Sequence, residues 1–246
     1  HYLDVMYETS GAEADRIDIE ELFEDTLREC YANDYKKNKG KHFSSPEELR
    51  EFFEDGKSIL DNFKKNKGGH FNKKGWYLVG CEIPLVIAPN MRLNRVKYMG
   101  YLDIVMYHEP TNTFKIIDIK TSTKGWGSYA KKDESKQFQL VLYKYFFSKQ
   151  YNIPIENIDI EFFIVRRKVY LDGEYPQKRI QTFTPASGKN KVNKATRNLD
   201  EFINRAFNLD GSYKDTIFEA NPSRWNCNFC PYKTKKELCN AVGKSL

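Results

Sequence analysis

The hydrophobic pattern of this 246-residue chain changes at residue 76, and this change most constrains the fold. Before residue 76 apolar residues recur at helical spacing, whereas several later segments are strand-like. We expect helices over 2–8, 17–32, 134–150 and 190–208, and strands over 76–88, 96–107, 114–121 and 158–166. Helix, three strands, helix, strand and helix in that order predict an α/β fold, with a mixed sheet flanked by helices.

Composition excludes two broad classes of protein. Hydrophobic residues make up 40% of the chain and aromatic residues 15%, enough for a sizeable core, so wholesale disorder is excluded. Apolar runs are too short for a spanning helix, so no membrane association is expected. We expect a helical region with a basic insertion over 1–75, a core over 76–210 and a cysteine-containing tail over 211–246.

The N-terminal region contains a short basic repeat. Tyr35-Lys-Lys-Asn-Lys-Gly-Lys-His-Phe43 recurs as Phe63-Lys-Lys-Asn-Lys-Gly-Gly-His-Phe71. Between the copies, Ser45-Pro46-Glu47-Glu48 predicts a helix start. The repeat is either a contact for phosphates or a solvated helical insertion, and the chain's net charge of +6 permits a nucleic-acid partner without requiring one.

Two aspartates lie within the predicted hairpin. A symmetric hairpin that pairs Tyr107 with Phe114 also places Asp103 opposite Asp118. Opposed Cβ atoms are about 4.5–5.5 Å apart, so two carboxylates there need a proton or a cation between them. Oxygen ligands suit a hard cation such as Mg²⁺. Lys120 follows on the same face as Asp118, and Gly100 leaves space for a close approach.

A surface ion pair between Asp118 and Lys120, with Asp103 in water, is the alternative interpretation of the same residues. The position of Asp103 in the assumed register favours the cation site over that alternative.

Three motifs in order carry a family resemblance: Gly100-x-x-Asp103, then Asp118-Ile119-Lys120, then Gln139-x-x-x-Tyr143. This set resembles the PD-(D/E)XK nuclease superfamily. It is most similar to the RecB-like branch, which includes AddB-type nucleases, CRISPR-associated RecB-like enzymes and phage exonucleases. The resemblance implies a restriction-endonuclease-like core and a metal-dependent nuclease.

The resemblance also implies residue roles. Asp103, Asp118 and the backbone carbonyl of Ile119 would ligate Mg²⁺ or Mn²⁺, and Lys120 would orient the attacking water. Gln139 and Tyr143, one helical turn apart, would face the active site. His1 and Glu82 are weaker metal-ligand candidates: His1 could instead be a tag remnant, and Glu82 an ordinary strand residue.

The C-terminal cysteines suggest a second metal. Cys227, Cys230 and Cys239 resemble the cysteine triplet of iron–sulfur RecB-like nucleases, which hold a 4Fe-4S cluster with one distant cysteine. Cys30 is the best internal candidate for that distant ligand. Zinc is a less natural occupant, and three reduced thiols are the alternative. An odd total of five cysteines favours a reducing compartment.

Basic and aromatic residues follow the Asp-x-Lys strand and could contact a nucleic-acid strand. They are Lys124, Trp126, Tyr129, Lys131 and Lys132, and a solvated loop is the alternative for each.

Together these features predict a DNA nuclease, a single-strand exonuclease in DNA recombination, repair or replication. Its partners would be DNA that is single-stranded or has free ends, and a helicase or other replication protein. We expect it in the cytoplasm of a bacterium or phage-infected cell rather than secreted. A non-catalytic DNA-binding module and a structure-selective endonuclease are the alternatives.

Overall fold

The computed structural model describes residues 1–71, 74–89, 95–170, 177–215, 220–228, 230–235 and 237–239. They divide into two compact units, His1–Asn198 and Leu199–Leu246, which are described separately. Helices and sheet therefore share the first unit. The expected division at residues 75 and 210 stays a prediction.

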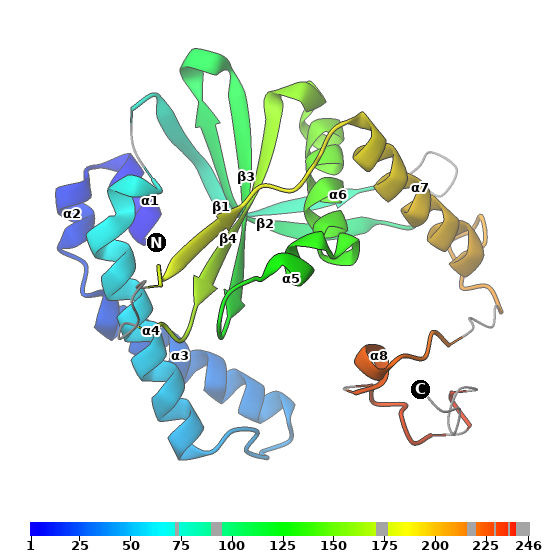
Figure 1. The fold of residues 1–246 in the computed structure, drawn as a ribbon, viewed down its shortest axis with the longest axis horizontal. Coiled ribbons are helices and arrows are strands. Elements are labelled where there is room, and N and C mark those ends of the chain that lie inside the picture. Colours follow the sequence, from blue (N-terminus) through cyan, green and yellow to red (C-terminus); the bar gives the residue numbers. More distant parts are fainter. Residues whose placement is uncertain are drawn as a thin grey trace. The chain divides into compact units, whose positions relative to one another are not determined.

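A five-stranded mixed sheet forms the centre of the first unit (Figure 1). Its strands, in spatial order, are β1 (Trp76–Ile87), β2 (Tyr98–His108), β3 (Thr113–Ser122), β4 (Ile158–Arg166) and β5 (Ile180–Phe183). Only β3 and β4 run parallel, and the remaining pairs are antiparallel. The mixed sheet and its first four strands are confirmed, while β5 is an addition.

Helices precede the sheet, lie within its connections and follow its last strand. They are α1 (Tyr2–Glu8), α2 (Gly11–Asp15), α3 (Ile19–Lys37), α4 (Pro46–Asn66), α5 (Ser128–Lys132), α6 (Glu134–Tyr151) and α7 (Lys189–Ala206). The four helices expected from periodicity are confirmed, although α3 continues five residues beyond the expected end at residue 32. The predicted helix after Ser45 is α4, with a complete capping box between Ser45 and Glu48.

The sheet is covered on both sides (Figure 1). On one side, Leu3 and Met6 of α1 pack with Ile104 and Ile117 of the sheet. On the other, α6 supplies Phe146, which stacks on Tyr98, and further buried residues such as Leu140 and Val141. Burial of both faces explains why β4 is apolar along most of its length. The interface of sheet and helices forms the core that positions the site.

α6 buries a different face from the one that Phe138, Leu142 and Tyr145 would define. Those three side chains are only half-buried, whereas Leu140, Val141, Tyr143 and Phe147 are buried. A face defined by Phe138, Leu142 and Tyr145 is therefore not the one that α6 buries most deeply. This helix is apolar around most of its surface, so periodicity alone does not identify its inner face.

The second unit contains the end of α7, a bridge between Phe207 and Tyr213, and the short helix α8 (Arg224–Asn228). None of the helices in the described part of the chain is long and apolar enough to cross a membrane.

Candidate functional site

A fork between β2 and β3 is the principal feature of the candidate site. The ladder pairs Tyr107 with Phe114, as the symmetric hairpin predicts, and continues to Ile104 and Ile117. There it ends, so the start of β2 pairs only with β1, and the end of β3 pairs only with β4. Asp103 and Asp118 are the first residues beyond the last rung, one on each arm of the fork.

The expectation that Asp103 and Asp118 form a directly opposed pair is thus corrected. The register is right, but the ladder stops one rung short of the aspartates. Like charges opposite one another destabilise a ladder, which favours separation of the strands at this point.

The side chain of Asp103 crosses the fork and binds the backbone of β3. The Ile119 N–H donates a hydrogen bond of 2.5 Å to Asp103 Oδ2. β2 also changes face here: Gly100 lies against Tyr143 of α6, whereas Ile104 packs with α1 on the other side. Strict alternation would place both on one face, so Asp103 lies where the alternation breaks.

The neighbouring strand β1 is also irregular at this level. Glu82, whose register position is opposite Asp103, is skipped in the ladder and has a left-handed φ of 53°. This conformation is unfavourable for a residue other than glycine and is concentrated at functional sites. Glu82, Asp103 and Asp118 thus occupy one level across three adjacent strands.

Asp118 is a buried carboxylate beside an ammonium group. Its side chain is 2% exposed, and Lys120 Nζ lies 2.8 Å from Oδ2. Among the described residues, no partner makes a well-formed hydrogen bond to this oxygen. Burial raises the pKa of Asp118 above its ordinary value; Lys120 opposes the shift, and the charge of Asp103 adds to it. The contact also shows that Asp118 and Lys120 share a face, as their spacing predicts.

The donor set at the fork fits a hard divalent cation in part. A buried carboxylate oxygen without a well-formed hydrogen bond, a second carboxylate nearby and the Ile119 carbonyl are ligands that Mg²⁺ accepts. Mg²⁺ commonly keeps several waters, so few protein ligands suffice. No three histidine, cysteine, aspartate or glutamate side chains are grouped to hold a metal anywhere in the described ranges. His1 and Glu82 therefore do not complete a ligand set in this arrangement.

A cavity of about 740 Å³ opens beside the fork, between the sheet and the N-terminal helices. His1, Glu82 and Asp103 all line it, so the structure brings the two weaker ligand candidates to the same cavity as Asp103. Much of the remaining wall is apolar and includes Tyr2 and Phe23. Asp118 and Lys120 are not part of this wall.

Gln139 and Tyr143 contact one another, as their helical spacing predicts. Gln139 Nε2 donates a hydrogen bond of 3.0 Å to the Tyr143 hydroxyl. A Cβ on Gly100 would lie 2.8 Å from the Tyr143 ring. The expectation of open space beside Gly100 is therefore wrong, because the tyrosine ring occupies it.

The expected DNA-contacting segment is partly helical, since it includes α5. Trp126 packs on Phe162, and its backbone exchanges two hydrogen bonds with the Gln181 side chain. Lys131 is half-buried, while Lys124, Lys132 and Tyr129 are exposed, Tyr129 at 78%. Tyr129 is thus the aromatic side chain of this segment that is open to a partner.

The cysteines fall in both units. Cys30 is exposed on α3 in the first unit, and Cys227, Cys230 and Cys239 are half-buried in the second. No described set of cysteine, histidine or carboxylate residues forms a metal-binding group, so the predicted cluster gains no support. Cys81 packs against the core, and burial raises its thiol pKa.

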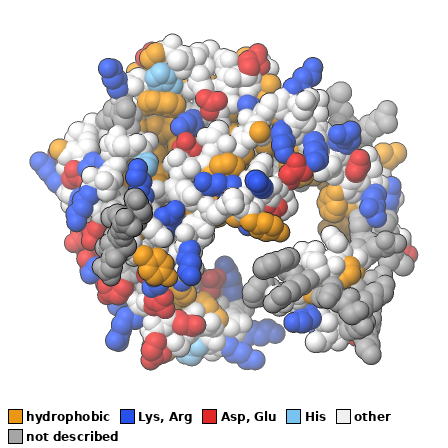
Figure 2. Space-filling model, in the orientation of Figure 1, with side chains coloured by type: hydrophobic (Ala, Val, Ile, Leu, Met, Phe, Trp, Pro, Cys, Tyr) orange, Lys and Arg blue, Asp and Glu red, His pale blue; other side chains and the backbone are white. Residues whose placement is uncertain are grey.

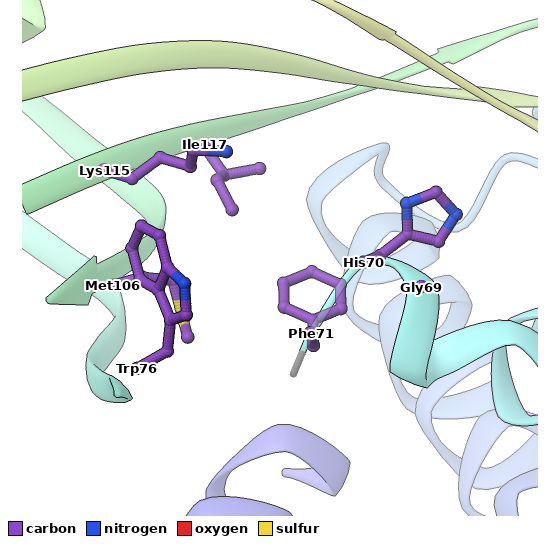
Figure 3. A pocket seen from close by; sticks show the side chains of 7 residues that line it. All are labelled: Gly69, His70, Phe71, Trp76, Met106, Lys115 and Ile117. Carbon is purple, nitrogen blue, oxygen red and sulfur yellow. The ribbon is translucent and has the colours of Figure 1, made fainter. Parts of the chain in front are cut away.

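Two further surface features were not predicted. A small cavity of about 110 Å³ lies near Trp76 and Lys115 (Figure 3), and a larger cleft beside it is lined by Lys65 and Lys178. Lysine and arginine side chains are otherwise interspersed with acidic ones over the visible face (Figure 2). The second copy of the basic repeat was the only sequence signal for this region.

Comparison with known families identifies the chain. The sequence model of the PD-(D/E)XK nuclease superfamily matches residues 3–235. The chain belongs to the PD-(D/E)XK nuclease superfamily. The mixed sheet flanked by helices is consistent with its restriction-endonuclease-like fold, so the expected superfamily and fold class are confirmed.

PD-(D/E)XK nucleases typically use Mg²⁺ or Mn²⁺, and membership implies a DNA substrate and supports a nuclease function in general. No curated protein matched this chain.

Proposed function

We propose that this PD-(D/E)XK protein is a Mg²⁺- or Mn²⁺-dependent deoxyribonuclease of RecB-like type. We further propose that it is a single-strand exonuclease acting in DNA recombination, repair or replication. The observation that carries the proposal is the buried Asp118 carboxylate, with Lys120 against it and Asp103 across the fork.

The residues of the fork divide the work between binding an ion and binding phosphate. Asp103, Asp118 and the Ile119 carbonyl would hold the metal, which supplies charge stabilisation and a bound water of lowered pKa. Lys120 is 32% exposed, so its Nζ can face a phosphate oxygen and stabilise charge that develops in the transition state. The hydrogen bond from the Ile119 N–H holds the Asp103 carboxylate toward β3.

Tyr143 and Gln139 would position the substrate. Because Gln139 donates to the Tyr143 oxygen, the hydroxyl proton of Tyr143 remains available to an acceptor. The close contact with Gly100 holds the tyrosine ring in place. Both residues would orient the strand rather than carry out the bond cleavage.

The cavity beside Asp103 supports an unpaired substrate. Its wall contains aromatic side chains, among them Tyr2 and Phe23. Aromatic side chains bind unstacked bases with little dependence on sequence. A strand end would bring both its bases and its phosphate to this region.

Digestion of end-labelled single-stranded DNA with Mg²⁺ or Mn²⁺ tests the proposal. We expect D118A and K120A to lose at least about 100-fold in rate, as removal of a transition-state contact does. D25N, which neutralises an exposed carboxylate on α3, is the control and should retain activity. Equal rates in all four proteins would reject the catalytic assignment.

Circular single-stranded DNA tests the exonuclease assignment. A strict exonuclease leaves the circle intact, whereas a structure-selective endonuclease would open it. DNA binding without any metal-dependent cleavage would instead identify a non-catalytic module.

For the C-terminal cysteines, the proposal of a 4Fe-4S cluster is supported only by the spacing Cys227-x-x-Cys230 and by Cys239. Brown protein with equal iron and sulfide content is expected. Colourless protein without iron would contradict it, and bound zinc would identify the other metal. A helicase partner remains a proposal from the resemblance, and a reducing compartment remains a proposal from the odd number of cysteines.

A further inference from the structure

The second copy of the basic repeat, Phe63–Phe71, lies between two hollows on the N-terminal side of the sheet. Its aromatic ends, Phe63 and Phe71, line the large cavity beside Asp103. Its middle, which includes Lys65 and the turn Gly68–His70, lines a separate cleft of about 600 Å³. One short segment therefore borders both the cavity beside Asp103 and this cleft.

The cleft is lined by hydrogen-bond donors and positive charge. Besides Lys65 and the turn, its wall contains Asn62, Asn66 and Lys178, and none of the lining residues is acidic. Neither the Lys65 nor the Lys178 ammonium forms an ion pair within the described residues. Two ammonium groups facing one hollow repel each other, so the cleft favours an anion.

The other two lysines of this copy provide a contrast. Lys64 Nζ donates hydrogen bonds to the Asp15 and Ile17 carbonyls. Lys67 pairs with the Asp15 carboxylate at 2.6 Å. These two hold the end of α4 and the turn after it against Asp15 and Ile17, whereas Lys65 makes no hydrogen bond or ion pair with the described residues.

The backbone at the cleft is open as well. A Cβ placed on Gly68 or Gly69 would meet no atom within 4 Å. His70 follows, with its ring edge-on to Phe163 at 5.2 Å, so the turn is fixed against the sheet. A ligand could approach this stretch of main chain closely.

The cleft continues toward the sheet. Gly69 and His70 also line the small cavity of Figure 3, together with Phe71 and Trp76. The figure shows Phe71 lying between Trp76 and His70. Because Phe71 also lines the cavity beside Asp103, the three hollows form a series on one side of the sheet.

We infer that the cleft formed by Asn62, Lys65, Asn66, Gly68–His70 and Lys178 binds a backbone phosphate of the DNA strand, away from the phosphate that is cleaved. The inference rests on the proposed function, since it extends the path of that substrate. Lysine side chains act as point charges toward phosphate, and side-chain amides donate further hydrogen bonds. This second contact would fix the direction in which the strand enters the fork.

The test is the affinity of the full chain for a fluorescent single-stranded oligonucleotide in EDTA, where cleavage does not interfere. The cleft variant is K65Q/K178Q, and the matched control is K97Q/K149Q, which removes two exposed lysines elsewhere. Each lost phosphate contact lowers the slope of log affinity against log salt by about 0.7 on a single strand. Because the cleft is inferred to bind one phosphate, we expect the cleft variant to lose about 0.7 from this slope and the control to lose none.

K65R/K178R is a second variant that keeps both charges and should restore the wild-type slope. Restoration would show that the slope depends on positive charge at these two positions. An unchanged slope in K65Q/K178Q, or an equal loss in the control pair, would overturn the inference.

A different experimental result would contradict the proposed nuclease function. If the wild-type protein binds DNA but does not cut it with Mg²⁺ or Mn²⁺, the nuclease assignment is wrong whatever the salt slopes are. If cleavage depends on Asp118 while the cleft variant binds normally, only the cleft is wrong.

Discussion

The burial of the Asp118 carboxylate lowers the stability of the folded protein. Because burial raises its pKa, the ionised side chain is less favourable in the folded protein than in the unfolded chain. The wild-type protein therefore loses stability as pH rises above the ordinary value of 3.8 and through the raised pKa. A functional role is the natural reason to keep an acid in such a place.

The substitution D118N should separate stability from activity. It removes the buried charge and leaves Lys120 partly solvated, so we expect the metal-free variant to be more stable than wild type at pH 7. The difference should shrink as pH falls through the raised pKa of Asp118, because the wild-type carboxyl then becomes protonated. Urea unfolding in EDTA across this pH range measures it, and nuclease activity should fall by at least about 100-fold. A variant less stable than wild type at pH 7 would show that the ion pair with Lys120 outweighs desolvation.

Gly100 is required by the ring of Tyr143, not by its backbone conformation. A methyl group at Gly100 would lie 2.8 Å from the ring, closer than Cβ contacts allow. We expect G100A to lose about 1–3 kcal/mol of unfolding free energy, with lower activity because Tyr143 must shift. The control G127A places its methyl in open space and should change stability by less than about 0.5 kcal/mol. Denaturant unfolding of G100A and G127A measures both changes. Equal stability of the two variants would contradict the close contact between Gly100 and the Tyr143 ring.

At the scale of elements, the sequence predicted more of the sheet than of the fork. Alternation and turn position were sufficient for β2, β3 and their register at Tyr107 and Phe114. The splaying of the strands was not predictable, because it involves a left-handed Glu82 on a third strand and the Ile119 N–H bound to Asp103. Neither appears in local periodicity.

Two short elements, β5 and α5, were not predicted from the sequence for a related reason. β5 has four residues, too few for a clear alternation, and it pairs with β4 from a distant part of the chain. α5 has five residues and carries no side-chain cap. Elements of this length are stabilised by tertiary packing, and a single sequence does not reveal that packing.

The helix α4 shows how a local sequence signal fixes a larger element. Its capping box begins the helix, and further along Asp55 pairs with Lys168 at 2.9 Å, beyond the end of β4. We expect S45A to lose about 1 kcal/mol of unfolding free energy, since the hydroxyl caps the Glu48 N–H. S44A, one residue earlier and outside the box, is the control. Equal unfolding free energies for the two variants would show that the cap adds nothing to the fold.

At the scale of the whole first unit, the fork between β2 and β3 is the place where buried charge is least compensated. The sheet is packed on both faces, yet at the fork two carboxylates approach each other without a ladder rung between them. In the structure, the Lys120 ammonium and the Ile119 N–H provide the available compensation. A cation bound there would relieve repulsion between β2 and β3, and so act on the stability of the sheet as well as on catalysis.

Metal binding should therefore raise the melting temperature of the whole protein. A ligand at 100 times its Kd adds about 2.7 kcal/mol to stability, which for a chain of this size corresponds to roughly 5–10 °C in Tm. We expect Mn²⁺ to produce such a shift in wild type and in D25N, whose lost carboxylate lies on α3. D118N should show little or no shift, because one of the two carboxylates at the fork is gone. Thermal scans with increasing Mn²⁺ measure this, and a shift of equal size in D118N would place the bound ion elsewhere in the protein.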